Sequence, residues 1–282
     1  MIFNIILIIA YLIVGIYLGY TIQSYLSYLK NLKKDKIKII FEKEPEKKKE
    51  VYDIVYILKN DIPGKPGELT YSLRSLQNFT YRKVWFVGGQ PSGLEPDGRI
   101  EIEQYGKTPY QKVYNSLRAV CENEEITENF YLFNDDFFIL HKMDKFEPMR
   151  DYSIHKLILN LNQKPKGNKN YVKELNITLG ILRNNNLSYW NYGTHTPFLL
   201  NKKNLRIMFE KFPRPGLFRT IYGNYFHVGG FTHEDCKIGW NMKMVPYDDW
   251  PVVSTSEKSF INGEVGKYLR EKFPEKSRFE ID

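Results

Sequence analysis

The sequence has few cysteines, no charge near its N-terminus and none of the usual glycine motifs of nucleotide-binding loops. Its two cysteines, Cys121 and Cys236, are too few for the disulfide framework of a small secreted domain. No Lys or Arg precedes Lys30, and the absence of a positively charged start argues against a cleaved signal peptide. The composition therefore favours a protein whose folded part lies in a reducing compartment.

Several catalytic signatures are also missing. Neither standard spacing of a phosphate-binding glycine loop occurs, and Gly88-Gly89 is only a turn. There is no serine nucleophile elbow. His233-Glu234-Asp235-Cys236 contains metal-ligand residue types, but no second spacing completes a zinc site. These absences argue against P-loop enzymes, serine hydrolases and structural zinc domains.

The N-terminus has a long apolar run instead. No charged residue occurs from Met1 to Leu29, and Ile2 to Ile22 is almost wholly apolar, about the length of 20 residues that a helix needs to cross a bilayer. Five lysines follow between Lys30 and Lys38, which places the rest of the chain in the cytoplasm by the positive-inside rule. We predict a single-pass transmembrane anchor at 1–24, in contact with membrane lipid, and a cytoplasmic C-terminal domain.

Charge is concentrated next to this run. Residues 25–50 mix lysine and glutamate with little to bury, which is typical of a stalk. The first fifty residues carry +4 of the net charge of +8. The remainder is too small a bias to indicate nucleic-acid binding. The 21 tyrosines and 18 phenylalanines suit a heavy core or a carbohydrate-facing surface.

The remaining residues, 51–282, alternate between strand-like and helix-like patterns. This order of strands and helices predicts an α/β fold with an open mixed sheet flanked by helices. Thr108, Pro109 and Gln111 form the start signal of a helix that runs to Glu122. The predicted strands are 51–58, 82–89, 98–104 and 129–140, and the predicted helices are 68–78, 109–122, 154–163, 173–184 and 202–212, while 265–273 is a short amphipathic stretch.

Polar side chains occur at or near the carboxyl ends of two of these strands. Asn60-Asp61 follows the first strand, and Asn134-Asp135-Asp136 interrupts the run 129–140. Ligands of open α/β sheets bind beyond the carboxyl ends of the strands. We therefore expect the two clusters to meet in one cleft.

The pair Asp135-Asp136 is the strongest sign of chemistry. Two adjacent carboxylates in an apolar run are costly unless they bind something, and hard oxygen ligands suit Mg²⁺ or Mn²⁺. Asn134 and Asp136 also have the polar-x-acid spacing of nucleotide-sugar transferases. The alternative is a strand-end pair that caps a turn or forms a salt bridge.

Two further residue types complete the candidate site. His195 lies in the extended segment YGTHTPF, where a neutral imidazole would accept the proton of an acceptor hydroxyl; the alternative is a hydrogen-bonded structural histidine. Arg74, Arg82 and Arg219 are candidates for binding phosphate, since a guanidinium binds phosphate through two parallel hydrogen bonds.

Taken together, these residues resemble the Stealth proteins, sugar-phosphate transferases of microbial capsule synthesis that are related to the animal lysosomal-enzyme phosphotransferase. The resemblance covers roughly 52–212 and also extends to short phage and bacterial transferase-like proteins with an Asn-Asp-Asp core. The matching segments are Asp53-Ile54-Val55-Tyr56, Glu68-Leu69, Tyr71 to Leu76, Arg82 to Val87, Asn115-Ser116, Tyr131 to Phe138 and His195-Thr196-Pro197.

The resemblance implies a GT-A-like fold and a metal-dependent transferase that moves a hexose 1-phosphate from a nucleotide-sugar donor to a glycan acceptor, in surface polysaccharide synthesis. In this interpretation Asp135 and Asp136 hold the metal ion, and His195, Asp136 and Arg219 act in catalysis. Substrate contacts are expected from Asp61, Glu68, Arg74, Asn115 and Asn134.

Two alternatives remain at the level of sequence. The family's first block usually continues with a tryptophan and an Asp-Gly-Ser-Asp turn, whereas this chain has Ile57-Leu58-Lys59-Asn60-Asp61. An ordinary GT-A glycosyltransferase would release a nucleoside diphosphate instead of the monophosphate. A non-catalytic binding module on a degenerate transferase fold is the third interpretation.

Overall fold

The structure is a computed structural model that describes residues 23, 50–60, 67–163, 169–233, 235–240, 242 and 249–281. The predicted anchor at 1–24 and the stalk at 25–50 lie outside these residues, except for Gln23 and Glu50. Within the described part of the chain, no helix combines the length and the apolar character that crossing a membrane requires. The elements below all belong to the unit Val51–Asp282.

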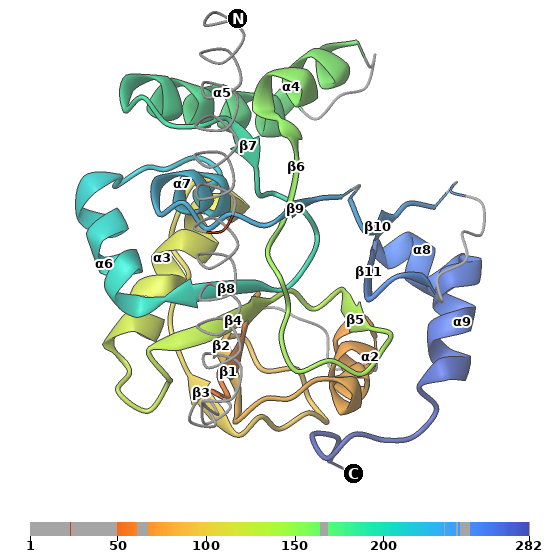
Figure 1. The fold of residues 1–282 in the computed structure, drawn as a ribbon. Helices are drawn as coiled ribbons and strands as arrows, with labels where there is room; N and C mark the ends of the chain where they lie inside the picture. Colours follow the sequence, from red (N-terminus) through yellow and green to blue (C-terminus); the bar gives the residue numbers. More distant parts are fainter. Residues whose placement is uncertain are drawn as a thin grey trace, which may run out of the picture. The chain divides into compact units, whose positions relative to one another are not determined.

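A five-stranded sheet forms the centre of this unit, with strand order β3-β2-β1-β4-β8 (Figure 1). The first four strands are parallel, and β8 pairs antiparallel with β4. The parallel strands therefore share one carboxyl edge, at which β1 ends with Leu58 and β4 ends with Phe133. The strand bounds are β1 Asp53–Leu58, β2 Val84–Gly88, β3 Gly98–Ile100, β4 Asn129–Phe133 and β8 Phe198–Asn201.

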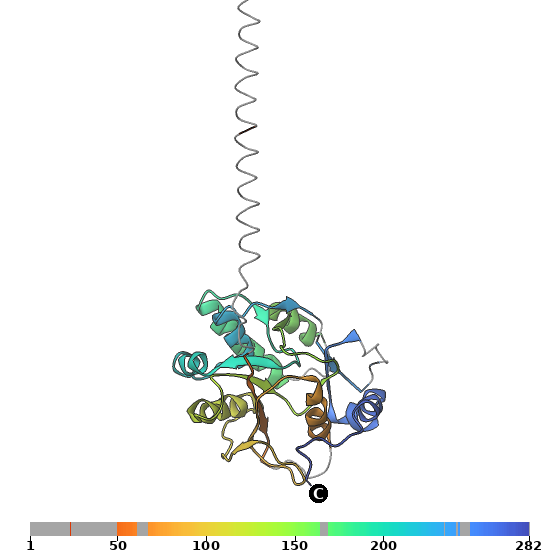
Figure 2. The same ribbon diagram turned by 60° about the horizontal axis from the view of Figure 1, so that its bottom comes forward.

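Both faces of this sheet are buried, which is why β1 and β4 read as continuous apolar runs. Along β4, Phe130 and Leu132 face one core, and Tyr131 and Phe133 face the other. Figure 2 shows α3 (Pro109–Glu122) and α6 (Lys202–Lys211) on one side of the sheet and α2 (Glu68–Ser75) on the other. The sheet thus separates two apolar layers.

Two small sheets extend this framework. One has the order β10-β11-β5 and the other the order β7-β6-β9. Helices α8 (Glu257–Asn262) and α9 (Glu264–Lys272) lie beside β10 and β11 (Figure 1). The strand bounds are β5 Phe137–Ile139, β6 Met149–Ser153, β7 Trp190–Asn191, β9 Phe231–Thr232, β10 Lys237–Ile238 and β11 Val252–Thr255.

Among the remaining helices, α4, α5 and α7 contribute to the same apolar core as α3 and α6, whereas α8 and α9 pack with β10 and β11 in a separate core. A 3₁₀ turn, η1 (Leu76–Asn78), extends α2. Tyr192 packs closely against α7, because a Cβ on Gly223 would lie 2.4 Å from the tyrosine ring. The helix bounds are α4 Ile154–Asn162, α5 Lys169–Asn184, α7 Phe218–Tyr225, α8 Glu257–Asn262 and α9 Glu264–Lys272.

The fold confirms the predicted mixed α/β class, with sheets flanked by helices. Most predicted elements occur within a few residues of their expected bounds. The prediction of one strand over 129–140 is wrong, because the run divides into β4 in the central sheet and β5, which pairs antiparallel with β11. The predicted strand 98–104 is also shorter and ends at Ile100.

Candidate functional site

Asn134, Asp135 and Asp136 form the turn that carries the chain from the central sheet into the sheet of β5. Phe137 N–H donates to the carbonyl of Asn134 at 3.3 Å and closes this turn. Asn134 is exposed, Asp135 is half-buried and Asp136 is buried. The acids therefore lie where two sheets diverge, at the carboxyl edge of the parallel strands, which is the usual ligand-binding edge.

Asp136 is held from one side only. Its Oδ2 accepts hydrogen bonds from Lys237 Nζ and Ser254 Oγ, each at 2.9 Å. Its Oδ1 is buried and has no hydrogen-bond partner among the described residues. A buried carboxylate oxygen without a partner costs free energy, so Asp136 has an unused ligand position.

Two other carboxyl groups share this environment. Glu68 accepts a short hydrogen bond from Thr255 Oγ1. Burial, followed by the charges of Asp136 and Asp135, raises the pKa of Glu68 to about 7, against the opposing effect of Thr255. Burial and the charge of Asp136 also raise the pKa of Asp135. Three acidic groups therefore share one environment, in which Lys237 hydrogen-bonds to Asp136.

A cavity of about 500 Å³ opens beside Asn134, on the α3 face of the central sheet. This volume is within the range of small-molecule binding sites. Side chains from the ends of strands and from loops supply much of its polar wall: Asn134, Asp151, Asn191, His195 and Asp235. Side chains from α3, α4, α5 and the start of α7 supply most of its apolar wall: Tyr110, Val113, Leu157, Tyr171 and Phe218.

His195 is oriented in this cavity by Asp235. Nδ1 lies 2.8 Å from Oδ2 and 3.0 Å from Oδ1 of the carboxylate, and the backbone N–H of His195 donates to Oδ1 at 3.0 Å. Because a carboxylate only accepts, Nδ1 carries the proton and Nε2 is the basic nitrogen. Burial acts to raise the pKa of Asp235, but the hydrogen bonds and charge of His195 outweigh it and lower the pKa.

Arg219 lines the same cavity without a carboxylate partner among the described residues. Nη1 donates to the carbonyl of Thr194 at 3.1 Å and Nη2 to that of Thr196, while the buried Nε has no partner there. Burial lowers the pKa of Arg219 to about 10, although the charges of Asp235 and Asp136 act to raise it. A cation whose neighbours are carbonyls retains charge for an anionic ligand.

Two helix N-termini meet this cavity and favour negative charge. Pro109 and Tyr110 of α3 line it, and Phe218 and Arg219 begin α7 beside it. Thr108 Oγ1 accepts from Gln111 N–H at 3.3 Å, which confirms half of the predicted capping box. Gln111 Oε1 accepts instead from the N–H one residue before Thr108.

Two of the candidate arginines are placed elsewhere. Arg74 Nε and Nη2 donate to the two carboxylate oxygens of Glu280 at 2.8 and 2.7 Å, which ties α2 to the C-terminal segment. Arg82 Nε and Nη2 donate in the same way to the buried Asp53 at 2.8 and 2.6 Å. Neither arginine lines the cavity, and in the structure both join segments that are distant in the sequence.

The other predicted contacts have mixed outcomes. Asn115 Nδ2 donates to the carbonyl of Tyr105 at 3.0 Å and does not line the cavity. Glu68 joins the Asp136 cluster through β11, as described above. Asp61 lies outside the described residues, so the expected meeting of the two strand-end clusters stays a prediction.

The acid cluster fits a divalent cation. Within the described ranges, no group of three or more His, Cys, Asp and Glu side chains is arranged to hold a metal ion. However, Mg²⁺ commonly binds through one or two carboxylates and completes its shell with water and substrate phosphate. Adjacent Asp135 and Asp136, with Oδ1 of Asp136 unpaired, provide such a donor set.

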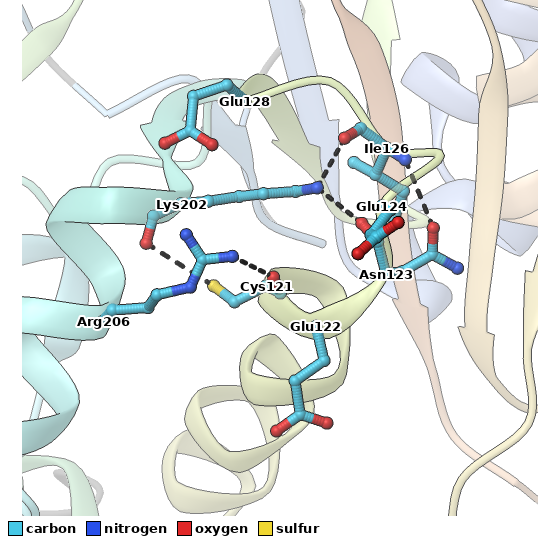
Figure 3. Close-up of a pocket in the computed structure, with 8 residues that line it drawn as sticks. All are labelled: Cys121, Glu122, Asn123, Glu124, Ile126, Glu128, Lys202 and Arg206. Carbon is cyan, nitrogen blue, oxygen red and sulfur yellow. Dashed lines mark hydrogen bonds between the residues drawn. The ribbon is translucent and has the colours of Figure 1, made fainter.

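A second cavity, of about 420 Å³, lies at the joint between α3 and α6 (Figure 3). The buried Lys202 donates from Nζ to the carbonyls of Asn123 at 2.6 Å and Ile126 at 2.5 Å. Arg206 donates to the carbonyl of Cys121. These cations bind the carbonyl groups at the end of α3. The charged residues of this cavity therefore stabilise the fold.

Asp235 and Lys237 are the functional candidates that sequence reasoning did not identify. In the sequence, Asp235 stands only within an incomplete zinc motif, and no motif contains Lys237. Both act on partners far along the chain, His195 at 40 residues and Asp136 at 101 residues. No local pattern marks such contacts.

No family model and no curated protein matches this sequence. The resemblance to the Stealth proteins therefore depends on the motifs quoted above.

Proposed function

We propose that this chain is a transferase that moves a sugar phosphate from a nucleotide-sugar donor to a hydroxyl group of a glycan acceptor. The observation that carries the proposal is the convergence, in one cavity at the carboxyl edge of the sheet, of His195, Asp235 and Arg219. A base, its orienting carboxylate and an anion-binding cation are the groups that attack on a phosphate requires.

His195 acts as the general base. Asp235 holds Nδ1–H, so Nε2 accepts the proton as the acceptor hydroxyl attacks. The carboxylate also stabilises the imidazolium that forms, as in other histidine–carboxylate pairs. Asp135 and Asp136, which follow Asn134 in the chain, remain available to bind a metal ion on the donor.

Arg219 and the N-termini of α3 and α7 bind the donor phosphates. The guanidinium supplies a positive charge that no carboxylate of the described residues pairs with, and the helix termini supply partial positive charge. These groups stabilise the charge that develops when the acceptor oxygen bonds to the sugar-bearing phosphorus and the bond to the nucleoside monophosphate breaks.

Asp135 and Asp136 would hold Mg²⁺ or Mn²⁺ on the donor diphosphate, with Asn134 beside them. When bound, the ion would neutralise negative charge on the phosphates. A GT-A-like arrangement of donor and metal is part of this proposal, and so is the membrane anchor of the N-terminal run.

Product analysis tests the proposal. The full-length protein is incubated with a panel of nucleotide sugars, a glycan acceptor and Mn²⁺ or Mg²⁺, and the released nucleotide is identified. We expect a nucleoside monophosphate and a sugar phosphate on the acceptor. A nucleoside diphosphate with a sugar joined directly to the acceptor would establish the glycosyltransferase alternative, and no turnover with any donor would favour the binding module.

Matched variants identify the residues that act. His195→Ala and Arg219→Met should abolish release of the nucleotide. His155→Ala and Arg99→Met should not, because His155 contacts Arg183 on the helical surface and Arg99 forms only a long, exposed pair with Glu101.

A further inference from the structure

The Asp136–Lys237 pair is asymmetric. The Asp136 side chain is 12% exposed, whereas the Lys237 side chain is 33% exposed. The ammonium group therefore reaches a buried carboxylate from a position near solvent. Leaving this contact returns Lys237 to water at low cost, whereas Asp136 remains buried and must find another cation.

The second oxygen of Asp136 adds to this imbalance. Ser254 and Lys237 both bind Oδ2, while Oδ1 is buried without a partner among the described residues. Glu68 and Asp135 add two more acidic groups to the same environment. Among the described residues, Lys237 is the cation that hydrogen-bonds to Asp136, at 2.9 Å, whereas Lys59 and Arg219 act on the acids through longer-range charge.

We propose that Lys237 is an exchangeable counter-ion, whose ammonium neutralises Asp136 until a divalent cation binds Asp135 and Oδ1 of Asp136 and its charge repels the ammonium from Oδ2. The inference rests on the proposed function for the identity of the cation. In this arrangement Ser254 keeps the carboxylate in place during the exchange, because its hydroxyl donates to Asp136 independently of Lys237. Lys237 then sets the concentration of metal at which the site fills.

Competition of this kind has a measurable consequence. A ligand that must first displace an internal group binds with an apparent affinity reduced by the fraction of sites that are free. Removing the ammonium should therefore strengthen cation binding, whereas loss of a merely structural lysine would weaken it or leave it unchanged. The sign of the change separates the two roles.

The first experiment titrates Mn²⁺ alone into the full-length protein by calorimetry. We expect Lys237→Met to bind Mn²⁺ about tenfold more tightly than the wild type. Lys267→Met is the matched control, since Lys267 forms an exposed pair with Glu271 at 3.8 Å, and should behave as the wild type. Adding Asp136→Asn to Lys237→Met should remove the gain. Equal or weaker binding by Lys237→Met would overturn the proposal.

A second measurement needs no variant and remains informative if Lys237→Met does not fold. Wild-type protein is treated with an amine-acetylating reagent with and without Mn²⁺, and labelling of each lysine is measured by mass spectrometry. Mn²⁺ should increase labelling at Lys237 and leave Lys267 unchanged. Unchanged or reduced labelling of Lys237 at saturating Mn²⁺ would contradict the exchange.

Neither experiment uses a nucleotide sugar. A negative result here together with nucleotide release in the transfer assay would refute only the role of Lys237. A positive result here with no release from any donor would refute the transferase and retain the cation exchange.

Discussion

His195 and Asp235 depend on each other at the scale of single residues. The carboxylate supplies both the tautomer and the orientation of the imidazole. An amide in its place would no longer require the proton to be on Nδ1, so the basic nitrogen would change. The histidine would remain in the cavity but lose its role.

We therefore expect Asp235→Asn to lower kcat by about 10²–10⁴-fold, the usual contribution of a positioned base, with little change in the donor KM. Steady-state kinetics at varied donor concentration measures both constants. Asp97→Asn, at a pair with Arg278 in a surface region, is the matched control. A kcat within twofold of the wild type for Asp235→Asn would exclude the orienting role.

Glu68 makes stability depend on pH. Its pKa is raised from 4.5 to about 7 in the folded state, so the folded state binds the proton more tightly than the unfolded state. Its stabilising contribution is therefore complete below pH 4.5 and is lost as the pH rises through 7.

In metal-free protein, the wild type should lose about 1–2 kcal/mol relative to Glu68→Gln between pH 5 and pH 8, a value reduced for the partial exposure of this side chain. Urea unfolding of both proteins at the two pH values measures the difference. Glu271→Gln, at an exposed position, should follow the wild type. A pH dependence identical for wild type and Glu68→Gln would show that Glu68 is not perturbed.

At the scale of elements, the end of α3 is held by side chains of α6. Lys202 is 4% exposed, and it binds two carbonyl groups of the segment that follows α3. The first residues of α3 line the candidate cavity, whereas its last residues are held by α6. One end of the helix therefore serves the proposed ligand binding and the other serves stability. Stability and activity should therefore separate.

Lys202→Met should destabilise the protein by about 1–3 kcal/mol, since it leaves buried carbonyl groups without donors. The neighbouring Lys203 is exposed, so Lys203→Met should have little effect. Thermal unfolding measures the stability of both variants. Nucleotide release per folded molecule should stay at the wild-type level in each, and a selective loss of activity in Lys202→Met would mean that the joint communicates with the site.

At the scale of the whole molecule, we expect the protein to be anchored in a membrane. Ile2 to Ile22 and the lysines that follow predict an anchored chain whose domain 51–282 faces the cytoplasm. The protein should sediment with membranes and resist alkaline carbonate extraction. Protease added to intact cells should leave the domain uncut. Cleavage of the domain by external protease would show the opposite orientation. Nucleotide sugars in the cytoplasm would then not reach the site.

The sequence by itself determined the four parallel strands of the central sheet and most of the helices, because their signals are local, whereas β8 carries no such signal. An apolar run buried on both faces marks β1, and Thr108 with Pro109 marks the start of α3. Residue chemistry also singled out Asp136, His195 and Arg219. The predictions of strands and helices succeed because periodicity and capping act over a few residues, whereas the roles of these three residues stay predictions.

Only the tertiary structure decided how these residues are paired. The polar residues Asn134–Asp136 interrupt the run 129–140 in the sequence, but only the structure shows that β4 and β5 belong to different sheets, because both are buried and apolar. The partners of His195 and Asp136, namely Asp235 and Lys237, come from a segment placed by β10 against β11. Long-range contacts also pair Arg74 with Glu280 and place Arg219 against the carbonyl groups of Thr194 and Thr196 and the ring of Phe198. Charge pairing depends on distance in space, which the order of residues along a chain does not specify.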